Sequence, residues 1–560
     1  MGIKSKLSGA KRLAKGIAKD GFAYTSGSRE YSKRKATNPF TDIGFDEWKK
    51  QRLIFERRER KEQLLTPMPI DMPVFVVMVE AAGKSEQLER TKASLLKMTL
   101  KPKKVFYGQR SSMAAKMAEY EAEYAGRDVW SIKLKAGDEL PSGYFFKLCP
   151  LAKDADIIYT DHELAGAKNA DEVFLKPDLS EDYLCAHDYI GRSYIVKNRV
   201  PESMDEGSYE YLLKAIAEKK KILHSADTIC ALVNDEEAED EEKISGLIKN
   251  VYESEDKKPA AVSVKTEGGI NIADLSWKEK NKISVIIPNK DHAKDLKASL
   301  ASLKKQTVYG NTEILIAENN STEKETFDYY EELKKEKNIR VLYWKEGFNY
   351  SAINNFAAGE AKGDILLLMN NDVELINEDA LSKMLSFVNL ERVGVVGAKL
   401  YYADDTVQHA GVAVGFQGVG GHEFVGLAKG DHGYMMMADC VRRVSAVTAA
   451  CLMIKKSVYD EVGGFDEEYA VAFNDVDLCM KVSKAGHQIL YLPYACGYHF
   501  ESKTRGNDTT DEEVARFGRE VTRFLEKWKD ELGRGDAFYN KNRSLNSMAE
   551  DRFRDLYGEG

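Results

Sequence analysis

The stretch on which the fold depends is Gly363–Leu375, G-D-I-L-L-L-M-N-N-D-V-E-L. A turn-forming Gly-Asp pair comes first, an unbroken apolar run follows, and Asn370-Asn371-Asp372 ends it. A short apolar run between polar residues is typical of a strand buried inside a parallel sheet. Ligands of open α/β sheets bind where such strands end, and a carboxylate there suits Mg²⁺ or Mn²⁺. An ordinary Asn/Asp turn is the alternative that this stretch alone leaves open.

The residues before this stretch alternate between strand-like and helix-like segments. We predict strands at 283–287, 313–317 and 341–344, each followed by a helix, before the opening strand begins. This alternation is typical of half of a nucleotide-binding parallel sheet. A similar series begins at Val74, where V-F-V-V-M-V reads as another buried strand. We therefore expect a degenerate internal repeat of two α/β domains.

Composition divides the chain into five parts. In order, they are a basic, partly helical N-terminal extension (1–70), a first α/β domain (71–235), an acidic linker (236–282), a clearer α/β domain (283–510) and a C-terminal helix with its tail (511–560). Residues 1–20 place apolar side chains near helical spacing among lysines and arginines. They predict either an amphipathic helix on an anionic membrane surface or a solvated basic tail, and both readings stay open.

The bulk composition limits the classes of function. The chain has 560 residues, a net charge of −9 and a sequence pI of about 5.7, which disfavours a general nucleic-acid binder. Its seven cysteines are scattered without a C-x-x-C pair, as expected for reduced thiols. The sequence shows neither a transmembrane-length apolar run nor a secretory signal. We expect a cytoplasmic protein. The basic N-terminus leaves open a second possibility, peripheral contact with the inner membrane surface.

Polar residues stand where several predicted strands end. Pro288-Asn289 follows the first strand, Glu318-Asn319 the second, and Asn370-Asn371-Asp372 the fourth. Asn474-Asp475 precedes a later helix, and His499 follows a strand-like segment. Because the carboxyl ends of parallel strands converge on one edge, these residues can share one cleft. Together they offer a partner for a nucleoside, a metal ligand beside a diphosphate, and a general base.

The region from Ile283 to about Gly506 resembles the family 2 glycosyltransferases, which are inverting enzymes with the GT-A fold, in the version common in bacterial surface-polysaccharide synthesis. The resemblance rests on the number and order of short strings, each of which is weak alone. The strings are I-S-V-I-I-P-N-K-D, I-A-E-N-N-S-T, F-N-Y-S-A-I-N-N, L-L-L-M-N-N-D-V-E, Q-H-A-G-V, S-A-V-T-A-A-C, V-G-G-F-D-E, A-F-N-D-V-D-L-C and Y-H-F-E-S. The resemblance implies an α/β fold of two GT-A (Rossmann-like) domains in tandem with helical N- and C-terminal extensions, the second domain being catalytic.

The resemblance also implies roles position by position. Pro288 and Glu318 would lie on the nucleoside, Asp372 would ligate Mg²⁺ or Mn²⁺ on the diphosphate, and Asp475 would be the catalytic base. His499 resembles a histidine that completes the metal site, and a structural histidine is the alternative. Other residues expected at the donor site are Asn289, Asn354, Asn370 and Asn371. The family usually has Asp where this chain has Glu318, and its D-x-D metal motif reads N-x-D here.

The sequence leaves open the roles of one pair of acids and of three histidines. Asp477 is as acidic as Asp475, and one of the two could cap the following helix or pair within it. Three histidines lie in the Gly-rich region 408–433, which reads either as an acceptor loop or as plain turns; they are His409, His422 and His432.

The first α/β domain departs from the pattern. D-I-I-Y-T-D at 156–161 and F-L-K-P-D at 174–178 resemble a glycosyltransferase-like domain that often precedes the catalytic one. Its metal stretch should resemble L-D-H-D-D-E-L, yet residues 134–140 read L-K-A-G-D-E-L. A lysine replaces the first acid and a glycine replaces a later one. We predict that this domain is inactive as a transferase and serves as a scaffold or an acceptor-binding module.

The sequence as a whole predicts a metal-dependent inverting glycosyltransferase. It would move a hexosyl or deoxyhexosyl group from a UDP- or dTDP-sugar to a glycan, lipid-linked or protein acceptor, in cell-surface polysaccharide synthesis. The alternative is a scaffold that binds sugar nucleotides or glycans without turnover.

Overall fold

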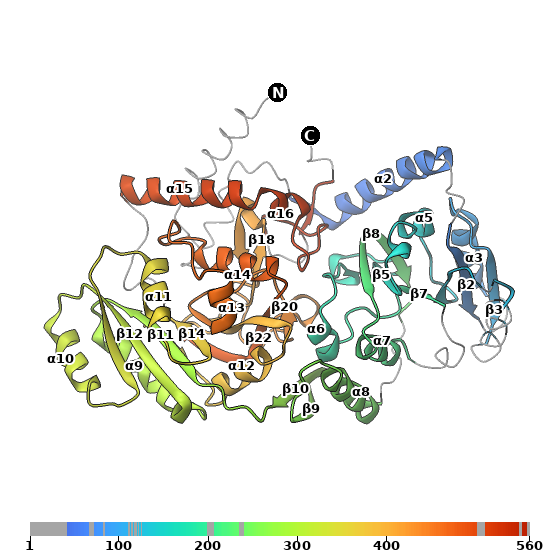
Figure 1. The fold of residues 1–560 in the computed structure, drawn as a ribbon. Coiled ribbons are helices and arrows are strands. Elements are labelled where there is room, and N and C mark those ends of the chain that lie inside the picture. The colour runs from blue at the N-terminus through green and yellow to red at the C-terminus, as the bar shows by residue number, and fades with distance from the viewer. Residues whose placement is uncertain are drawn as a thin grey trace. The chain divides into compact units, whose positions relative to one another are not determined.

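The computed structural model describes residues 42–66, 72–81, 85–109, 113, 116, 120, 122–124, 126–198, 207–234, 240–500, 510–547 and 552–556. The helix predicted for residues 1–20 lies outside the described residues. The described chain forms two compact units (Figure 1). We call Glu255–Ser263 with Asp274–Asp536 the C-terminal unit, and Phe40–Ser254, Val264–Ala273 and Ala537–Gly560 the N-terminal unit. Both units combine sheets and helices, which confirms the predicted α/β class.

The C-terminal unit alternates strands and helices through its first half, as its sequence predicts. Its strands are β11 (Ile283–Asn289), β12 (Thr312–Asn319), β13 (Ile339–Trp344), β14 (Ile365–Met369), β15 (Val373–Leu375), β16 (Val393–Tyr401), β17 (Val407–His409), β18 (Val412–Val414), β19 (Gly420–His422), β20 (Arg442–Arg443), β21 (Cys451–Lys455) and β22 (Gln488–His499). Its helices are α9 (Ala293–Lys304), α10 (Lys324–Leu333), α11 (Tyr350–Gly359), α12 (Ala380–Val388), α13 (Lys456–Glu461), α14 (Asn474–Lys484), α15 (Asp511–Lys527) and α16 (Lys529–Arg534).

A ten-stranded sheet forms the core of this unit, in the order β13-β12-β11-β14-β21-β16-β22-β15, with β17 on β16 and β20 on β22. The strand at its centre is β14, and all of its residues are buried. It runs parallel to β11 and antiparallel to β21. Residues 363–375 thus contain a buried central strand that is followed by the predicted polar residues, Asn370-Asn371-Asp372.

The first strand of the sheet runs past the proline that was expected to stop it. Its ladder with β14 ends at Ile286, whereas its ladder with β12 continues to Asn289. Pro288 thus lies where only one neighbour pairs, and a strand tolerates a residue without an N–H group there. The extra length carries Asn289 to the edge of the sheet where the other strand ends lie.

The N-terminal unit is built from a shorter set of elements. Its strands are β1 (Asp42–Gly44), β2 (Val74–Glu80), β3 (Lys104–Gly108), β4 (Val129–Lys135), β5 (Ile157–Leu164), β6 (Val173–Phe174), β7 (Tyr194–Lys197), β8 (Ile222–Leu232) and β23 (Arg552–Arg554). Its helices are α2 (Phe45–Leu65), α3 (Glu86–Leu96), α5 (Tyr144–Leu148), α6 (Glu181–Ala186), α7 (Ser208–Ala217) and α8 (Glu241–Glu253).

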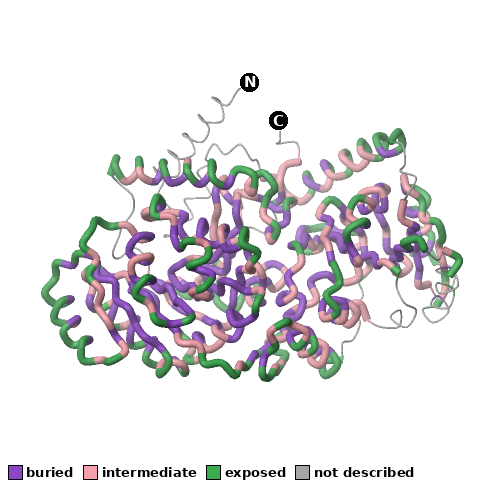
Figure 2. The backbone as a smooth tube through the Cα atoms, viewed as in Figure 1, coloured by how far each residue is buried: buried purple, intermediate pink, exposed green. Residues whose placement is uncertain are grey.

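The sheets of the two units share one pairing pattern. In the N-terminal unit, β3, β2 and β4 are parallel, β7 is antiparallel to both β4 and β5, and β8 is parallel to β5. In the C-terminal unit, β12, β11 and β14 are parallel, β21 is antiparallel to β14 and β16, and β22 is parallel to β16. The same order of parallel and antiparallel neighbours supports the internal repeat expected from the sequence. Figure 2 shows buried residues concentrated along these strands.

The C-terminal part, expected as one piece over 511–560, is divided between the units. Helices α15 and α16 belong to the C-terminal unit, whereas Ala537–Gly560 belongs to the N-terminal unit. There β23 pairs antiparallel with β1, and Phe553 stacks on Trp48 with ring centroids 4.5 Å apart. A pairing between residues about 500 positions apart leaves no local pattern in the sequence.

The region expected as an acidic linker, 236–282, contains regular structure. Helix α8 lies within it, and two antiparallel strands follow, β9 (Ala261–Glu267) and β10 (Ile270–Ser276). Among the described residues, no helix combines the length and the apolar character that crossing a membrane requires.

Gly363, the first residue of the opening stretch, is expected to tolerate no side chain. A Cβ atom there would lie 2.6 Å from the Lys282 carbonyl oxygen and 2.7 Å from the Ser284 backbone nitrogen, so β11 or β14 would have to shift. We expect Gly363→Ala to destabilise the protein by about 1–3 kcal/mol, the usual range for overpacking. Guanidinium unfolding measures this change.

Gly359→Ala is the matched control, because nothing lies within 4 Å of a Cβ at this last residue of α11. It should leave stability unchanged or raise it slightly. Equal stability of the two variants would contradict the close approach at Gly363.

Candidate active site

Asp372 and His499 meet at the polar end of the central strand. After β14 the chain turns into β15, which pairs antiparallel with β22 so that Val373 faces His499. This register brings His499 Nε2 to 3.2 Å from Asp372 Oδ1. The Phe500 N–H also donates to the Asp372 carbonyl oxygen at 3.1 Å. The structure therefore brings together the two residues that the sequence singled out as metal ligands.

Gln408 fixes the orientation of the His499 ring. Its side-chain oxygen lies 2.7 Å from His499 Nδ1, and its amide nitrogen lies 3.4 Å from the His499 carbonyl oxygen. Because an amide oxygen only accepts hydrogen bonds, Nδ1 carries the ring proton and donates it to Gln408. The Nε2 lone pair is then directed toward Asp372 and the Asn370 amide, which lies 3.2 Å away. This is the tautomer that a metal-binding histidine needs.

The side chains present fit a divalent cation. A carboxylate and an imidazole nitrogen side by side at a strand end are donors that Mn²⁺ accepts readily, and Mg²⁺ accepts the carboxylate. Both side chains are about nine-tenths buried, so a cation between them would offset the cost of burying the Asp372 charge. No group of three or more acidic, histidine or cysteine side chains with metal-binding geometry occurs in the described part of the chain.

Asp475 lies in the first turn of α14, where it is half-buried. Its Oδ2 atom accepts a hydrogen bond from the Ala449 N–H at 3.1 Å. Asp477, two residues on, is fully buried and paired elsewhere, with Trp528 Nε1 at 2.8 Å and Lys527 Nζ at 2.7 Å. Asp477 is thus held by structural partners outside its own helix, and the role of Asp475 as the base stays a prediction.

Tyr350 links the metal-ligand pair to the Asp475 side. Its hydroxyl lies 3.3 Å from both Asn370 Oδ1 and the Ala449 carbonyl oxygen. Burial raises the pKa of Tyr350, and the Asp475 and Asp372 carboxylates raise it further. One tyrosine therefore lies within electrostatic reach of both carboxylates.

A row of polar contacts crosses the ends of β14, β11 and β12. The Asn371 amide donates to Asn289 Oδ1 at 2.7 Å, and the Asn289 amide donates to the Tyr330 hydroxyl at 2.7 Å. Tyr330 in turn donates to Glu318 at 2.6 Å, and Ser321 donates to the same carboxylate. These contacts hold the predicted donor-site residues in fixed positions. Pro288 precedes Asn289 in β11 and is half-buried.

Asn354, another predicted donor-site residue, lies in the packed interior of α11. Its side chain is fully buried, and its amide donates to the Tyr350 carbonyl oxygen at 2.8 Å. The structure therefore places Asn354 behind Tyr350, where it supports the helix that carries this tyrosine.

The Gly-rich region 408–433 is partly ordered into strands β17, β18 and β19. His409 is fully buried, accepts the Thr448 N–H at Nε2, and has Nδ1 3.3 Å from His422 Nδ1. Burial lowers the pKa of His409 well below its usual range, and the neighbouring His422 lowers it further. His432 lies apart from them and pairs with Asp439 at 2.7 Å. The neutral His409 is thus a packing group directly behind the loop that holds Asp475.

Three contributors to the site were not singled out from the sequence: Tyr350, Gln408 and Ala449. Each lies inside one of the strings quoted for the family resemblance, namely F-N-Y-S-A-I-N-N, Q-H-A-G-V and S-A-V-T-A-A-C. The strings were the available signal, but they do not indicate which atoms the residues contact.

The corresponding corner of the N-terminal unit contains an internal cation. Asp138, which follows β4, is fully buried, and both of its oxygens bind Arg192, at 2.6 Å and 3.0 Å. It also accepts the N–H groups of Lys135 and Val233. Its carboxylate is therefore compensated by a guanidinium and by backbone donors.

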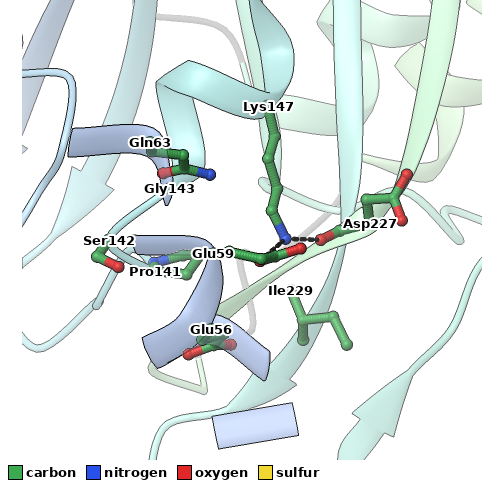
Figure 3. A pocket seen from close by; sticks show the side chains of 9 residues that line it. All are labelled: Glu56, Glu59, Gln63, Pro141, Ser142, Gly143, Lys147, Asp227 and Ile229. Carbon is green, nitrogen blue, oxygen red and sulfur yellow. Dashed lines mark hydrogen bonds and ion pairs between the residues drawn. The ribbon is translucent and has the colours of Figure 1, made fainter. Parts of the chain in front are cut away.

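A hollow lies in the N-terminal unit between α2 and α5 (Figure 3). Its centre is Lys147, whose ammonium group lies 2.7 Å from Glu59 and 2.9 Å from the Asp227 carbonyl oxygen. Burial raises the pKa of Glu56 beside it, although Arg52 and Lys147 lower that pKa in part. The lysine is satisfied by groups of this unit, so these contacts anchor α2 to its domain.

Comparison with known proteins identifies part of the C-terminal unit. Residues 284–462 match the model of the family "Glycosyl transferase family 2". The chain therefore contains a family 2 glycosyltransferase domain, as the resemblance implied, and the match spans β11 to α13, including Asp372.

Relatives of the chain are found among bacterial proteins. An uncharacterised protein, y4gI, of Sinorhizobium fredii is 44% identical over 266 residues, which is 47% of this chain and 29% of that protein. The O-antigen biosynthesis protein RfbC of Myxococcus xanthus is 29% identical over 414 residues, 70% of this chain and 31% of that protein. The matches thus cover about a third of these relatives. A crystal structure of GalNAc-T7 with UDP, GalNAc and Mn²⁺ aligns with 48% of this chain and 52% of its own, at 16% identity and a TM-score of 0.38.

Removing the hydrogen-bond acceptor at position 408 is expected to weaken metal binding. Without it the His499 ring loses the partner that fixes its tautomer, and such losses cost about 10–100-fold in metal affinity. We expect this loss in Gln408→Leu, measured as free Mn²⁺ by electron paramagnetic resonance in a titration with UDP present.

Gln408→Glu keeps an acceptor oxygen facing Nδ1 and should bind Mn²⁺ within a few-fold of the parent protein. Unchanged Mn²⁺ affinity in the leucine variant would contradict the assigned tautomer.

Proposed function

We propose that this chain is an inverting glycosyltransferase that moves a sugar from a nucleotide-sugar donor to a hydroxyl group of an acceptor. The observation that carries the proposal is the link between two carboxylate sites: Asp372 with His499 at one end, and Asp475 at the other, with Tyr350 between them. The family match over 284–462 supports the same reaction class.

In the proposed reaction, Asp475 acts as the general base. It accepts the proton of the acceptor hydroxyl while that oxygen forms a bond with the anomeric carbon. The bond between the anomeric carbon and the diphosphate oxygen breaks on the opposite face, and its electron pair leaves with the nucleoside diphosphate. A positioned base of this kind contributes about 10²–10⁴-fold to the rate. The hydrogen bond from Ala449 keeps Asp475 oriented for this role.

Asp372 and His499 would hold the divalent metal ion, Mg²⁺ or Mn²⁺, with the Asn370 amide beside them. When bound, such an ion supplies positive charge that stabilises the leaving diphosphate. The contribution of the chain is to fix the two ligands, through the pairing of β15 with β22 and through Gln408.

The donor nucleoside would lie along the row formed by Asn371, Asn289 and Glu318, with Pro288 at its edge. We propose a UDP- or dTDP-sugar as the donor, carrying a hexosyl or deoxyhexosyl group. The acceptor would be a glycan, a lipid-linked saccharide or a protein, in the cytoplasm or at the inner membrane face. The O-antigen biosynthesis relative supports a role in cell-surface polysaccharide synthesis. The N-terminal unit would serve as a scaffold or as an acceptor-binding module.

Asp475→Asn is expected to lower turnover about 10²–10⁴-fold while donor affinity stays close to that of the parent protein. An asparagine oxygen can still accept the Ala449 N–H, so the loop geometry is preserved and only the basic group is lost. The measurement is release of nucleoside diphosphate from UDP-, dTDP- and GDP-sugars with Mg²⁺ or Mn²⁺, with donor affinity followed by calorimetry.

Asp372→Ala serves as the companion variant and should lose both turnover and Mn²⁺ binding. Full turnover in either variant would refute the assigned roles. Donor binding without turnover by the parent protein, across the whole panel of donors, would instead favour a sugar-nucleotide-binding scaffold.

A further inference from the structure

Helix α15 packs against the segment that carries the proposed base. The ring of Phe473, two residues before Asp475, lies 5.7 Å from that of Phe517 and 5.5 Å from that of Phe524. These two phenylalanines form the buried face of α15. The helix thus provides an apolar support for the chain immediately before α14.

Glu520 lies on the same buried face and is the only acidic residue of α15 among its buried residues. It is 2% exposed, and its two oxygens accept the N–H groups of Val471 at 3.0 Å and Ala472 at 3.1 Å. Arg516, one turn earlier, lies 3.8 Å away. A carboxylate is rarely buried to this extent unless its oxygens are bound. Both of these oxygens are committed to the backbone that leads to Asp475.

A second contact holds the other side of the base. Asp477, in the first turn of α14, binds Trp528 and Lys527 at the C-terminal end of α15. The residues before and after Asp475 are therefore attached to the same helix.

The opposite side of the segment is held by α11. The Tyr350 N–H donates to the Ala470 carbonyl oxygen at 2.9 Å, and the Ser351 hydroxyl donates to the Tyr469 carbonyl oxygen. Within this doubly held segment, Phe473 has a φ of +61°, in the left-handed region. A residue with a β-carbon adopts that conformation only where its surroundings enforce it. Glu520 binds the two residues before Phe473, and the phenylalanines of α15 pack against its ring.

We propose that Glu520 is a positioning residue, which fixes the 471–475 backbone so that Asp475 points at the acceptor hydroxyl. This role rests on the proposed function of Asp475 as the base. Helix α15 lies outside the residues that match the family model, and in this role it would support the active site. A misplacement of about 1 Å at a catalytic group is enough to lower a rate by about 10²-fold.

The chemistry of position 520 requires a carboxylate. Two backbone N–H groups need two acceptor oxygens, whereas a glutamine offers one oxygen and directs an N–H group at the second donor. Glu520→Gln should therefore keep one of the two contacts, and Glu520→Ala should keep neither. Glu526→Gln is the matched control, because Glu526 is exposed on the same helix.

The test combines kinetics with hydrogen exchange on the full chain. We expect kcat to fall about 10-fold in Glu520→Gln and about 100-fold in Glu520→Ala, while KM for the donor stays within twofold of the parent value. Amide exchange of peptides covering 469–476 should become at least about 10-fold faster in both variants, and Glu526→Gln should match the parent in every measurement. A purely structural role would alter melting temperature and donor KM without this selective loss of kcat.

The outcomes separate the positioning role from the base. Parent-like kcat or parent-like exchange in Glu520→Gln, with Asp475→Asn inactive, would overturn the positioning role and leave the proposed function intact. Full turnover in Asp475→Asn would overturn the proposed function and the positioning role with it. If Glu520→Ala does not fold, the glutamine variant decides alone, because it preserves size and one contact.

Discussion

The site depends on one strand pairing, that of β15 with β22. The central strand β14 ends in a carboxylate that is largely buried, and such a charge needs a compensating partner. The short antiparallel ladder places His499 opposite Val373, although 129 positions separate Asn370 from His499 in the sequence. The Nε2 lone pair of the neutral ring then faces Asp372, so a cation held between the two side chains would compensate the carboxylate. Gln408 then directs the ring. Without this ladder, Asp372 would be an ordinary residue in a turn after a strand, which is the alternative that the opening stretch allowed.

The sequence predicted what local patterns determine. The bounds of β14 match the apolar run, and the alternation of strands and helices before it matches the observed elements, because burial and periodicity are local properties. It also predicted the close approach of Asp372 to His499, although only through the resemblance. The contacts that complete the site join distant segments: Tyr350 with Ala449, and Glu520 with Val471. No local periodicity encodes such pairs, and the split of the tail between the two units was missed for the same reason.

The two units show two ways to compensate an acidic residue after an equivalent strand. In the N-terminal unit, the Asp138 carboxylate is held by Arg192 and by backbone N–H groups, so its charge is neutralised by the protein itself. In the C-terminal unit, the corresponding corner offers an imidazole whose lone pair is directed at Asp372. Arg192 is a permanent part of the protein, so a metal ion cannot take its place beside Asp138. The neutral His499 imidazole, in contrast, has a lone pair that can bind a metal ion together with Asp372. The shared strand order with different compensation explains why one unit is proposed for chemistry and the other for support.

The two acids of α14 show how the surroundings select one group for chemistry. Asp475 and Asp477 are two residues apart, so their side chains leave the helix on nearly opposite sides. On one side Lys527 and Trp528 bind Asp477 and bury it completely. On the other side Asp475 accepts only backbone N–H groups, those of Ala449 and Val476, and stays half-buried. A general base must exchange a proton with a substrate, and a carboxylate already held by an ammonium and an indole N–H is poorly suited to that. The structural pairing of Asp477 is therefore itself an argument for Asp475, because it orients the helix and leaves only one of the two acids facing the site.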